Sequence, residues 1–77
     1  MSLRLPVVTG RQTIRALERA GFVLVRVKGS HHVMEHSHDP ARTATVPVHG
    51  AKALKRGTLR SIVNQAGLTI EEFRNLL

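Results

Sequence analysis

The sequence predicts an α+β fold in which a three-stranded antiparallel sheet carries helices on one face, in the order α-β-β-β-α-α. Three observations support this prediction. Two capping boxes open helical patterns, a Gly-Ser dipeptide joins two runs of strand-forming residues, and a third strand-like run follows a short turn. The short connections make neighbouring strands antiparallel, and the sheet face without helices is left for a ligand.

The first residues are expected to form an extended arm followed by a helix. Residues 1–8 have no helical period, and Pro6 disfavours helix just before it. Thr9 and Gln12 form a capping box, which opens a helix that ends at Gly21.

Three strands are expected next. Residues 22–28 and 31–36 are rich in strand-forming residues and form a hairpin. Residues 37–41 contain an Asp-Pro pair, which predicts a turn. Residues 43–48 form the third strand, in which Pro47 marks an edge strand or a strand end.

A basic loop and two helices complete the predicted fold. The loop covers residues 49–57, and Thr58 is the expected N-cap of a helix that Gly67 closes. Thr69 and Glu72 form a second capping box, which opens a short terminal helix.

Length and composition limit the function classes. Residues 1–77 are expected to form a single domain, which is too small for a deep active-site cleft. Twelve Lys and Arg against five Asp and Glu give a net charge of +7, which favours a polyanionic partner. Phe22 and Phe73 are the only aromatic residues and are expected to be buried, so binding through stacked bases is poorly supported. The chain has no cysteine, membrane span or signal peptide, so a soluble, cytoplasmic protein without a membrane partner is expected.

The hairpin tip is the most informative stretch of the chain. Gly29 can take the positive φ that a II′ turn requires, and this turn places Lys28 opposite His31. Pleat alternation then puts Arg26, Lys28, His31 and Val33 on one face, and Val25, Val27, His32 and Met34 on the other. The second set is mostly apolar and is expected to face the core. His31 is therefore expected in solvent among cations, where a neutral imidazole is suited to meeting a phosphodiester.

Four stretches of the chain resemble one protein family. They are residues 9–22 (TGRQTIRALERAGF), 25–32 (VRVKGSHH), 45–50 (TVPVHG) and 57–68 (GTLRSIVNQAGL). In this order they resemble the HicA-type (YcfA-like) toxins of bacterial toxin–antitoxin pairs. The resemblance extends from about Thr9 to Leu77.

This resemblance implies a double-stranded-RNA-binding-domain-like fold and cleavage of mRNA that needs neither the ribosome nor a metal or other cofactor. It also implies neutralisation by a HicB-type antitoxin encoded beside the toxin. The family's catalytic histidine lies in a Gly-Ser-His motif, which matches Gly29, Ser30 and His31. His32 follows at once and is the alternative, but the predicted hairpin register favours His31.

The proposed chemistry needs few groups. RNA carries its own nucleophile, the 2′-hydroxyl, so a minimal ribonuclease needs a base and cations that hold the phosphate. His31 is the expected base, and the alternative is an ordinary exposed turn histidine. His32 is expected to pack against Val27 and Met34. His49 is either an acid or phosphate ligand, or a satisfied histidine at a strand end.

Basic residues supply the expected RNA contacts. The expected RNA-binding residues are Arg26, Lys28, Gly29, Ser30, His49, Lys52, Lys55, Arg56 and Arg60. The last four precede or open a helix, whose positive end can also hold phosphate, and the alternative is a solvated loop. A second basic stripe, formed by Arg11, Arg15 and Arg19, extends the RNA footprint or meets an acidic antitoxin.

Two other functions remain alternatives to this interpretation. A non-catalytic RNA-binding module would bind RNA and leave it intact, and a basic protein-interaction module would serve only an acidic partner. No metal site is expected, because His32 and His36 share a strand face but would stand about 13 Å apart at ~3.3 Å per residue.

Overall fold

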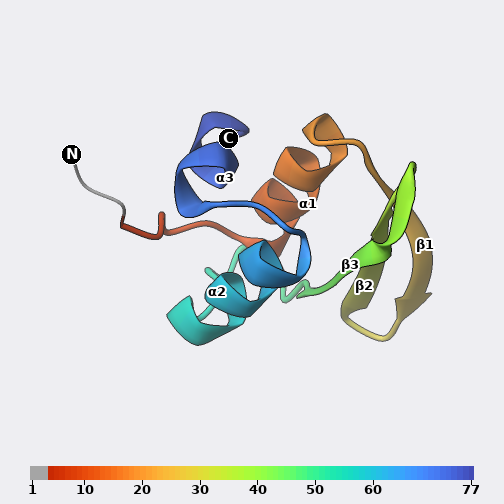
Figure 1. Ribbon diagram of the computed structural model, residues 1–77. Coiled ribbons are helices and arrows are strands. Elements are labelled where there is room, and N and C mark those ends of the chain that lie inside the picture. The colour runs from red at the N-terminus through yellow and green to blue at the C-terminus, as the bar shows by residue number, and fades with distance from the viewer. Residues whose placement is uncertain (1–3) are drawn as a thin grey trace.

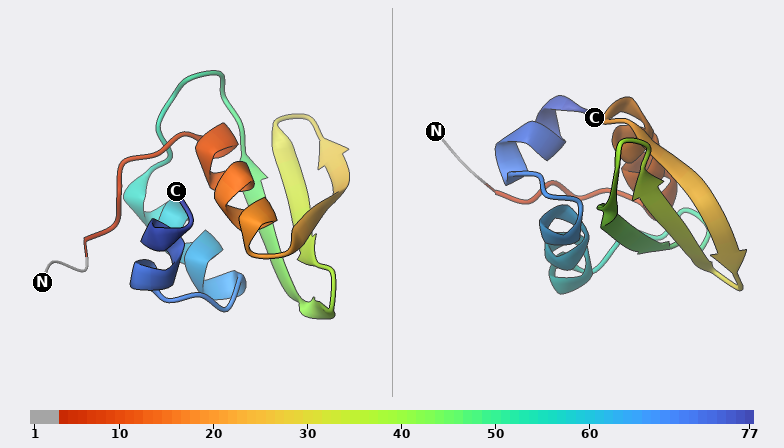
Figure 2. Two further views of the ribbon diagram at one scale, coloured as in Figure 1. Left: turned by 90° about the horizontal axis from the view of Figure 1, so that it is seen from above. Right: turned by 45° about the vertical axis from the view of Figure 1, so that its right-hand side comes forward.

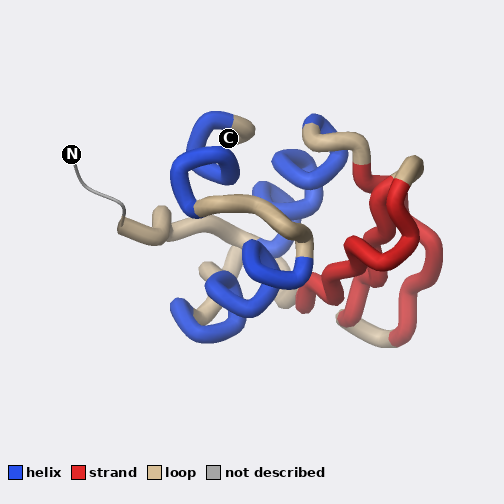
Figure 3. Tube along the Cα trace, in the orientation of Figure 1, coloured by secondary structure: helices blue, strands red, loops and turns tan. Residues whose placement is uncertain are grey.

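The computed structural model describes residues 4–77 of the chain, and its elements follow the predicted order α-β-β-β-α-α (Figure 1 and Figure 3). The elements are α1 (Gly10–Arg19), β1 (Phe22–Lys28), β2 (His31–His36), β3 (Asp39–Pro47), α2 (Arg56–Gln65) and α3 (Ile70–Asn75). The three strands form one antiparallel sheet in the order β1-β2-β3. This arrangement confirms the predicted α+β fold of the double-stranded-RNA-binding-domain-like type.

Local sequence signals set both ends of α1. The Thr9 hydroxyl accepts a hydrogen bond from the Gln12 amide at 3.2 Å, and the Gln12 side chain accepts one from the Thr9 amide at 2.8 Å. Gly21 follows the helix with a φ of 96°, which glycine adopts without strain. Thr69 and Glu72 form the second predicted capping box at the start of α3.

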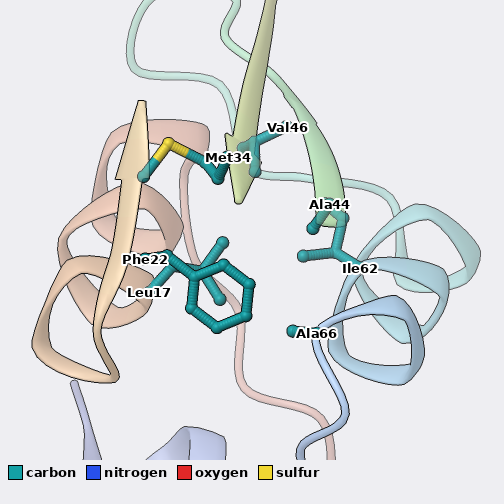
Figure 4. Close-up of a cluster of buried hydrophobic side chains, with 7 residues drawn as sticks. All are labelled: Leu17, Phe22, Met34, Ala44, Val46, Ile62 and Ala66. Atoms are coloured by element: carbon teal, nitrogen blue, oxygen red, sulfur yellow. The ribbon is translucent and has the colours of Figure 1, made fainter. Parts of the chain in front are cut away.

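The helices lie on one side of the sheet. Figure 2 shows α1 and α2 packed between the sheet and α3, while the opposite sheet face carries no helix. The contact is made by a buried cluster formed by Leu17, Phe22, Met34, Ala44, Val46, Ile62 and Ala66 (Figure 4). Burying a large apolar side chain stabilises a fold by ~1.5–3 kcal/mol, so this cluster fixes the sheet against the helices.

A second buried cluster lies farther from the sheet. It contains Leu5, Val8, Ala16, Leu59, Val63 and Phe73. The described part of the expected N-terminal arm, residues 4–8, therefore packs through two apolar side chains, and residues 1–3 lie outside the described residues. No helix within residues 4–77 has the length and apolar character that a membrane crossing requires.

The predicted turn over residues 37–41 is too long. Only Ser37 and His38 form the turn, because Asp39 already pairs with His36 and opens β3. The register then shifts before Thr43 pairs with Glu35, so the intervening residues bulge from the sheet. The Asp-Pro signal acts locally as expected, since the Asp39 carboxylate accepts a hydrogen bond from the Ala41 amide at 3.2 Å. The pairing of β2 with β3 therefore continues on both sides of the Asp-Pro turn.

The predicted start of α2 is also wrong. The helix begins at Arg56, its N-cap is Lys55 without a side-chain hydrogen bond, and Thr58 lies in the first turn. The preceding chain is fixed by tertiary contacts, because Ala53 forms a bridge with Thr9 and the Leu54 amide donates to the Val8 carbonyl at 2.8 Å. This anchoring sets where the helix begins and overrides the capping preference of threonine.

The valines of β1 were expected in the core, and this expectation is wrong. Val25 and Val27 are 50% and 51% exposed, whereas Met34 on the neighbouring strand is fully buried. The reason is that β1 is an edge strand with a register shift between Leu24 and Arg26, where Val25 is the extra residue. The end of the hairpin therefore extends past the helices that cover the rest of the sheet (Figure 2).

Candidate active site at the hairpin tip

The turn between β1 and β2 has the predicted geometry. Gly29 has a φ of 59°, and no described residue other than glycine has a positive φ, which together fit a two-residue II′ turn. Lys28 pairs with His31, Val27 with His32 and Arg26 with Val33, so the predicted register at the tip is confirmed.

His31 is exposed at the first position of β2, with a partner strand on each side. It pairs with Lys28 on β1 and with Pro47 on β3. The Val48 amide donates to the Ser30 carbonyl at 2.8 Å. Because these residues flank His31 and Pro47, the pair of His31 and Pro47 is of the non-hydrogen-bonded type. Pro47 therefore costs the ladder no hydrogen bond, and the strands hold His31 in a defined position although its side chain is open to solvent.

The sheet face around His31 is basic near the tip. Arg26, Lys28 and His31 share the face opposite the helices, and all three are exposed. Glu35 lies on the same face, but four residues along β2 separate it from His31, or about 13 Å at ~3.3 Å per residue. An anion that approaches His31 at the tip thus meets cations before it meets a carboxylate.

The basic loop after β3 connects the end of the sheet to α2. The Lys52 amide donates to the His49 carbonyl at 3.1 Å, and Gly50 has the positive φ of 59° that this tight turn requires. His49, Lys52 and Lys55 line a hollow of about 450 Å³ together with Pro47, Ala53, Leu54 and Thr58. Because Pro47 is also the cross-strand neighbour of His31, the hollow and the hairpin tip adjoin, and Figure 2 shows the loop after β3 and the hairpin tip at the same end of the molecule.

The structure does not gather all the predicted RNA-binding cations at this hollow. Arg56 and Arg60 are exposed on α2 but do not line it. Arg60 instead borders a separate hollow of about 310 Å³ beside Leu68 and Ile70. Sequence proximity grouped Arg60 with Lys52 and Lys55, whereas the turn of the helix separates them.

His32 faces the helix side of the sheet. It is half-buried, shares that face with Met34, and its Nδ1 atom lies 3.3 Å from the Ser30 carbonyl. This position directs its imidazole away from the basic face.

The other two histidines near the hairpin lie at the far end of the sheet. The His36 ring meets Phe22 edge-on at 5.2 Å, and its Nδ1 accepts a hydrogen bond from the His38 amide at 3.1 Å. Within residues 4–77, no three His, Cys, Asp or Glu side chains gather in a way that could hold a metal ion.

One supporting residue, Gly10, was missed by the sequence analysis. It is buried at the start of α1, and a Cβ atom there would overlap the Pro47 carbonyl oxygen and approach the Val48 Cα to 3.1 Å. The first turn of α1 thus packs directly on the strand segment that neighbours His31. The available signal was a glycine at the first position of a helix, where it has no capping role.

Most of the chain matches a known protein family. Residues 10–68 match the family described as "HicA toxin of bacterial toxin-antitoxin", and this region is more than half of the chain. The chain belongs to the HicA toxin family. The resemblance carried by the four sequence motifs is thereby confirmed. Among curated proteins, no sequence matches the chain.

The matched region locates the HicA features on the fold. It begins at Gly10 and ends at Leu68, so it includes the Gly-Ser-His tip, the sheet, the basic loop and α2, and it stops before α3. As a HicA toxin, the chain has an antitoxin as its expected counterpart in a toxin–antitoxin pair.

Proposed function

We propose that this HicA protein is a metal-independent, ribosome-independent mRNA endoribonuclease in which His31 is the general base. One observation carries the proposal: an exposed histidine stands on a basic sheet face beside Arg26 and Lys28. Its neighbour Pro47 forms the edge of a hollow lined by further basic groups. We also propose that it acts in the cytoplasm, where mRNA is translated.

The reaction follows from the chemistry of RNA. The His31 imidazole takes the proton of a 2′-hydroxyl, the 2′ oxygen bonds to the adjacent phosphorus, and the bond from phosphorus to the 5′ oxygen breaks. The 5′ oxygen takes a proton from solvent, so the products are a 2′,3′-cyclic phosphate and a 5′-hydroxyl. A well-placed general base accelerates such a step by ~10²–10⁴-fold, which suffices for a toxin if a few cleavages silence a message.

The neighbouring cations have a second task in this proposal. Arg26 and Lys28 lie on the face of His31, where they can neutralise the charge that grows on the phosphate oxygens. Lys52, Lys55 and His49 line the adjoining hollow and would hold the next phosphates of the same strand. Exposed side chains at both places suit an RNA backbone that crosses the surface.

The same surface suggests where the antitoxin would bind. We propose that a HicB-type antitoxin covers the hairpin tip and contacts His31 or the cations beside it. Carboxylates placed against Arg26 and Lys28 would exclude phosphate, and opposite charges would speed association at low salt.

The experiment uses a short RNA with one 2′-deoxy nucleotide at the mapped cleavage site. The full-length protein should cleave the all-RNA strand to a 2′,3′-cyclic phosphate and leave the substituted strand intact at that position. The two strands should bind with similar affinity, because the phosphates are unchanged. Cleavage at the 2′-deoxy position would contradict attack by the 2′-hydroxyl. Binding without cleavage of either strand would favour a non-catalytic RNA-binding module.

A further inference from the structure

The free edge of β1 carries most of the exposed large hydrophobic side chains among the described residues, and the proposed nuclease site leaves it unused. β1 has only β2 as a neighbour, because the sheet order is β1-β2-β3. Four of its side chains, those of Val23, Leu24, Val25 and Val27, are 48–51% exposed. Isolated exposed apolar residues are common, but three consecutive positions of this edge strand and a fourth beyond Arg26 expose apolar side chains together.

A hydrogen bond at the start of β1 shows which backbone groups point away from β2. The Ser37 amide donates to the Gly21 carbonyl at 3.0 Å, so the pair of Phe22 and His36 is of the non-hydrogen-bonded type. Two residues farther along, Leu24 opposite Met34 has the same type, and its N–H and C=O groups point outward.

The same conclusion holds at the hairpin tip. A two-residue turn closes on a hydrogen-bonded pair, here Lys28 with His31, so the adjacent Val27 directs its N–H and C=O groups outward. Within residues 4–77, no backbone hydrogen bond joins Leu24 or Val27 to a segment beyond β2. An added strand would therefore find donors and acceptors at these two positions.

The two faces of this edge differ in chemistry. Leu24 and Val27 share the helix-facing side with Met34 and His32, whereas Arg26 and Lys28 point to the opposite side. A strand that paired here would gain most from apolar side chains on the helix side and acidic side chains on the other.

The other edge of the sheet is protected in ways that β1 is not. β3 contains Pro40 and Pro47, which have no N–H groups, and it packs against α2. The Arg42 side chain also ties this edge to α2, because its Nε donates to the Ala66 carbonyl at 2.8 Å. β1 has no proline, and its protection consists of one bulged residue and two cations, which repel like charges and attract carboxylates.

We infer that β1 accepts a strand from the antitoxin, with acidic residues opposite Arg26 and Lys28 and apolar residues beside Leu24 and Val27. The inference rests on the proposed function only in naming the antitoxin as the partner. Charge complementarity supports this occupant, since the chain carries a net charge of +7. The added strand would also place its carboxylates about 10 Å from β2, at two strand spacings of ~4.8 Å, and so next to the His31 face.

A second copy of the chain fits this edge less well. Two-fold pairing about Val27 would put Arg26 directly opposite the second copy's Lys28, and this repulsion would occur twice. Both copies would also carry the full positive charge. The charge pattern of the edge therefore favours a partner of opposite sign.

Amide hydrogen exchange, measured by NMR on the full-length chain, tests this inference. The toxin is produced as the His31→Ala variant, because this variant is expected not to arrest the growth of the producing cells. The probe is the HicB-type antitoxin encoded beside the toxin. In the free toxin the Leu24 and Val27 amides should exchange rapidly, and in the complex they should exchange at least about tenfold more slowly. Val27→Pro removes the outward N–H without removing a ladder bond and should weaken antitoxin binding at least about tenfold, whereas Val27→Ala, which keeps the N–H, should weaken it less.

Several outcomes would overturn the inference. Unchanged exchange at Leu24 and Val27 in a saturated complex would show that the antitoxin binds elsewhere. If the antitoxin does not bind the toxin at all, it is not the partner of this edge. Protection that grows with the concentration of free toxin would indicate a second copy, and protection by RNA alone would assign the edge to RNA. If these amides become protected but wild-type protein leaves RNA intact, the nuclease proposal fails and the strand addition stands.

Discussion

His31 and Pro47 face each other across β2 and β3 as a non-hydrogen-bonded pair, and this relationship joins the two parts of the proposed site. The histidine lies on the basic face at the hairpin tip, and the proline forms one edge of the hollow that Lys52 and Lys55 line. Such pairs bring the Cα atoms to about 4.5 Å, closer than hydrogen-bonded pairs. In the proposed mechanism, a single RNA strand would contact both parts.

Replacing His31 with alanine should abolish growth arrest on expression and lower the rate of RNA cleavage by ~10²–10⁴-fold, the usual contribution of a general base. Because the side chain is exposed, the free energy of unfolding should change by no more than about 0.5 kcal/mol. Cleavage rates and thermal melts of purified protein check both statements.

His38→Ala is the matched control for this prediction, because it removes an exposed histidine from the turn at the other end of the sheet. It should leave cleavage unchanged. A fully toxic His31→Ala protein together with an inactive His32→Ala protein would instead assign the base to the neighbouring residue.

RNA affinity should fall steeply with salt, because each phosphate contact releases a counterion. Lys52→Ala and Lys55→Ala should each reduce the slope of log K against log salt by about one unit. Arg4→Ala removes an exposed arginine before α1, away from the hollow, and should leave the slope unchanged. Binding titrations at four salt concentrations measure these slopes, and unchanged slopes in both lysine variants would remove the hollow from the interface.

Cleavage should persist in excess EDTA, because the proposed mechanism uses an imidazole base and side-chain cations. The measurement compares initial rates before and after exhaustive treatment with chelator. Activity that disappears with chelator and returns with zinc would reject the metal-free mechanism and direct attention to the histidines of the hairpin.

Gly10→Ala should destabilise the fold by ~1–3 kcal/mol, because the new methyl group overlaps the backbone of Pro47 and Val48. Gly57→Ala is the control, since a Cβ there meets nothing within 4 Å and the residue lies in the first turn of α2. This second change should be neutral or stabilise by up to ~1 kcal/mol. Thermal unfolding measures both, and equal melting temperatures for the two variants would contradict the proposed close packing.

Glu72 should contribute a pH-dependent part of the stability. Hydrogen bonding to Thr69 lowers the pKa of the Glu72 carboxyl, with a smaller lowering from Arg42. A carboxyl whose pKa is lower in the folded state stabilises the fold above its unfolded pKa, and this stabilisation disappears as the pH falls through the folded pKa. Glu72→Gln should therefore reduce the acid-induced loss of stability relative to the control Glu71→Gln, as measured by denaturant unfolding at several pH values.

Signals between neighbouring residues gave the most accurate sequence predictions. The II′ turn at Gly29 fixed the pairing of Lys28 with His31, and Thr9 and Thr69 begin helices with the expected capping boxes. These features depend on contacts between residues at most four positions apart, which a sequence displays directly.

Features that depend on distant parts of the chain were not predicted. Thr58 has a good capping side chain, but the bridge between Thr9 and Ala53 sets the start of α2. The alternation along β1 placed Val27 in the core, whereas it lies on an edge strand beyond a bulge and is 51% exposed. The identity of His31 as the candidate base was predictable, but its connection through Pro47 to the hollow required the fold.

The second core cluster ties the assembly of the basic loop to the order of synthesis. Leu5 and Val8 emerge from the ribosome early, but their partners include Phe73, and the Val8 carbonyl also accepts the bond from Leu54 that anchors the loop. The hairpin can pair soon after His36 emerges, whereas this cluster must wait for α3. The basic loop thus reaches its final position only after α3 has formed, later than the hairpin tip that carries His31.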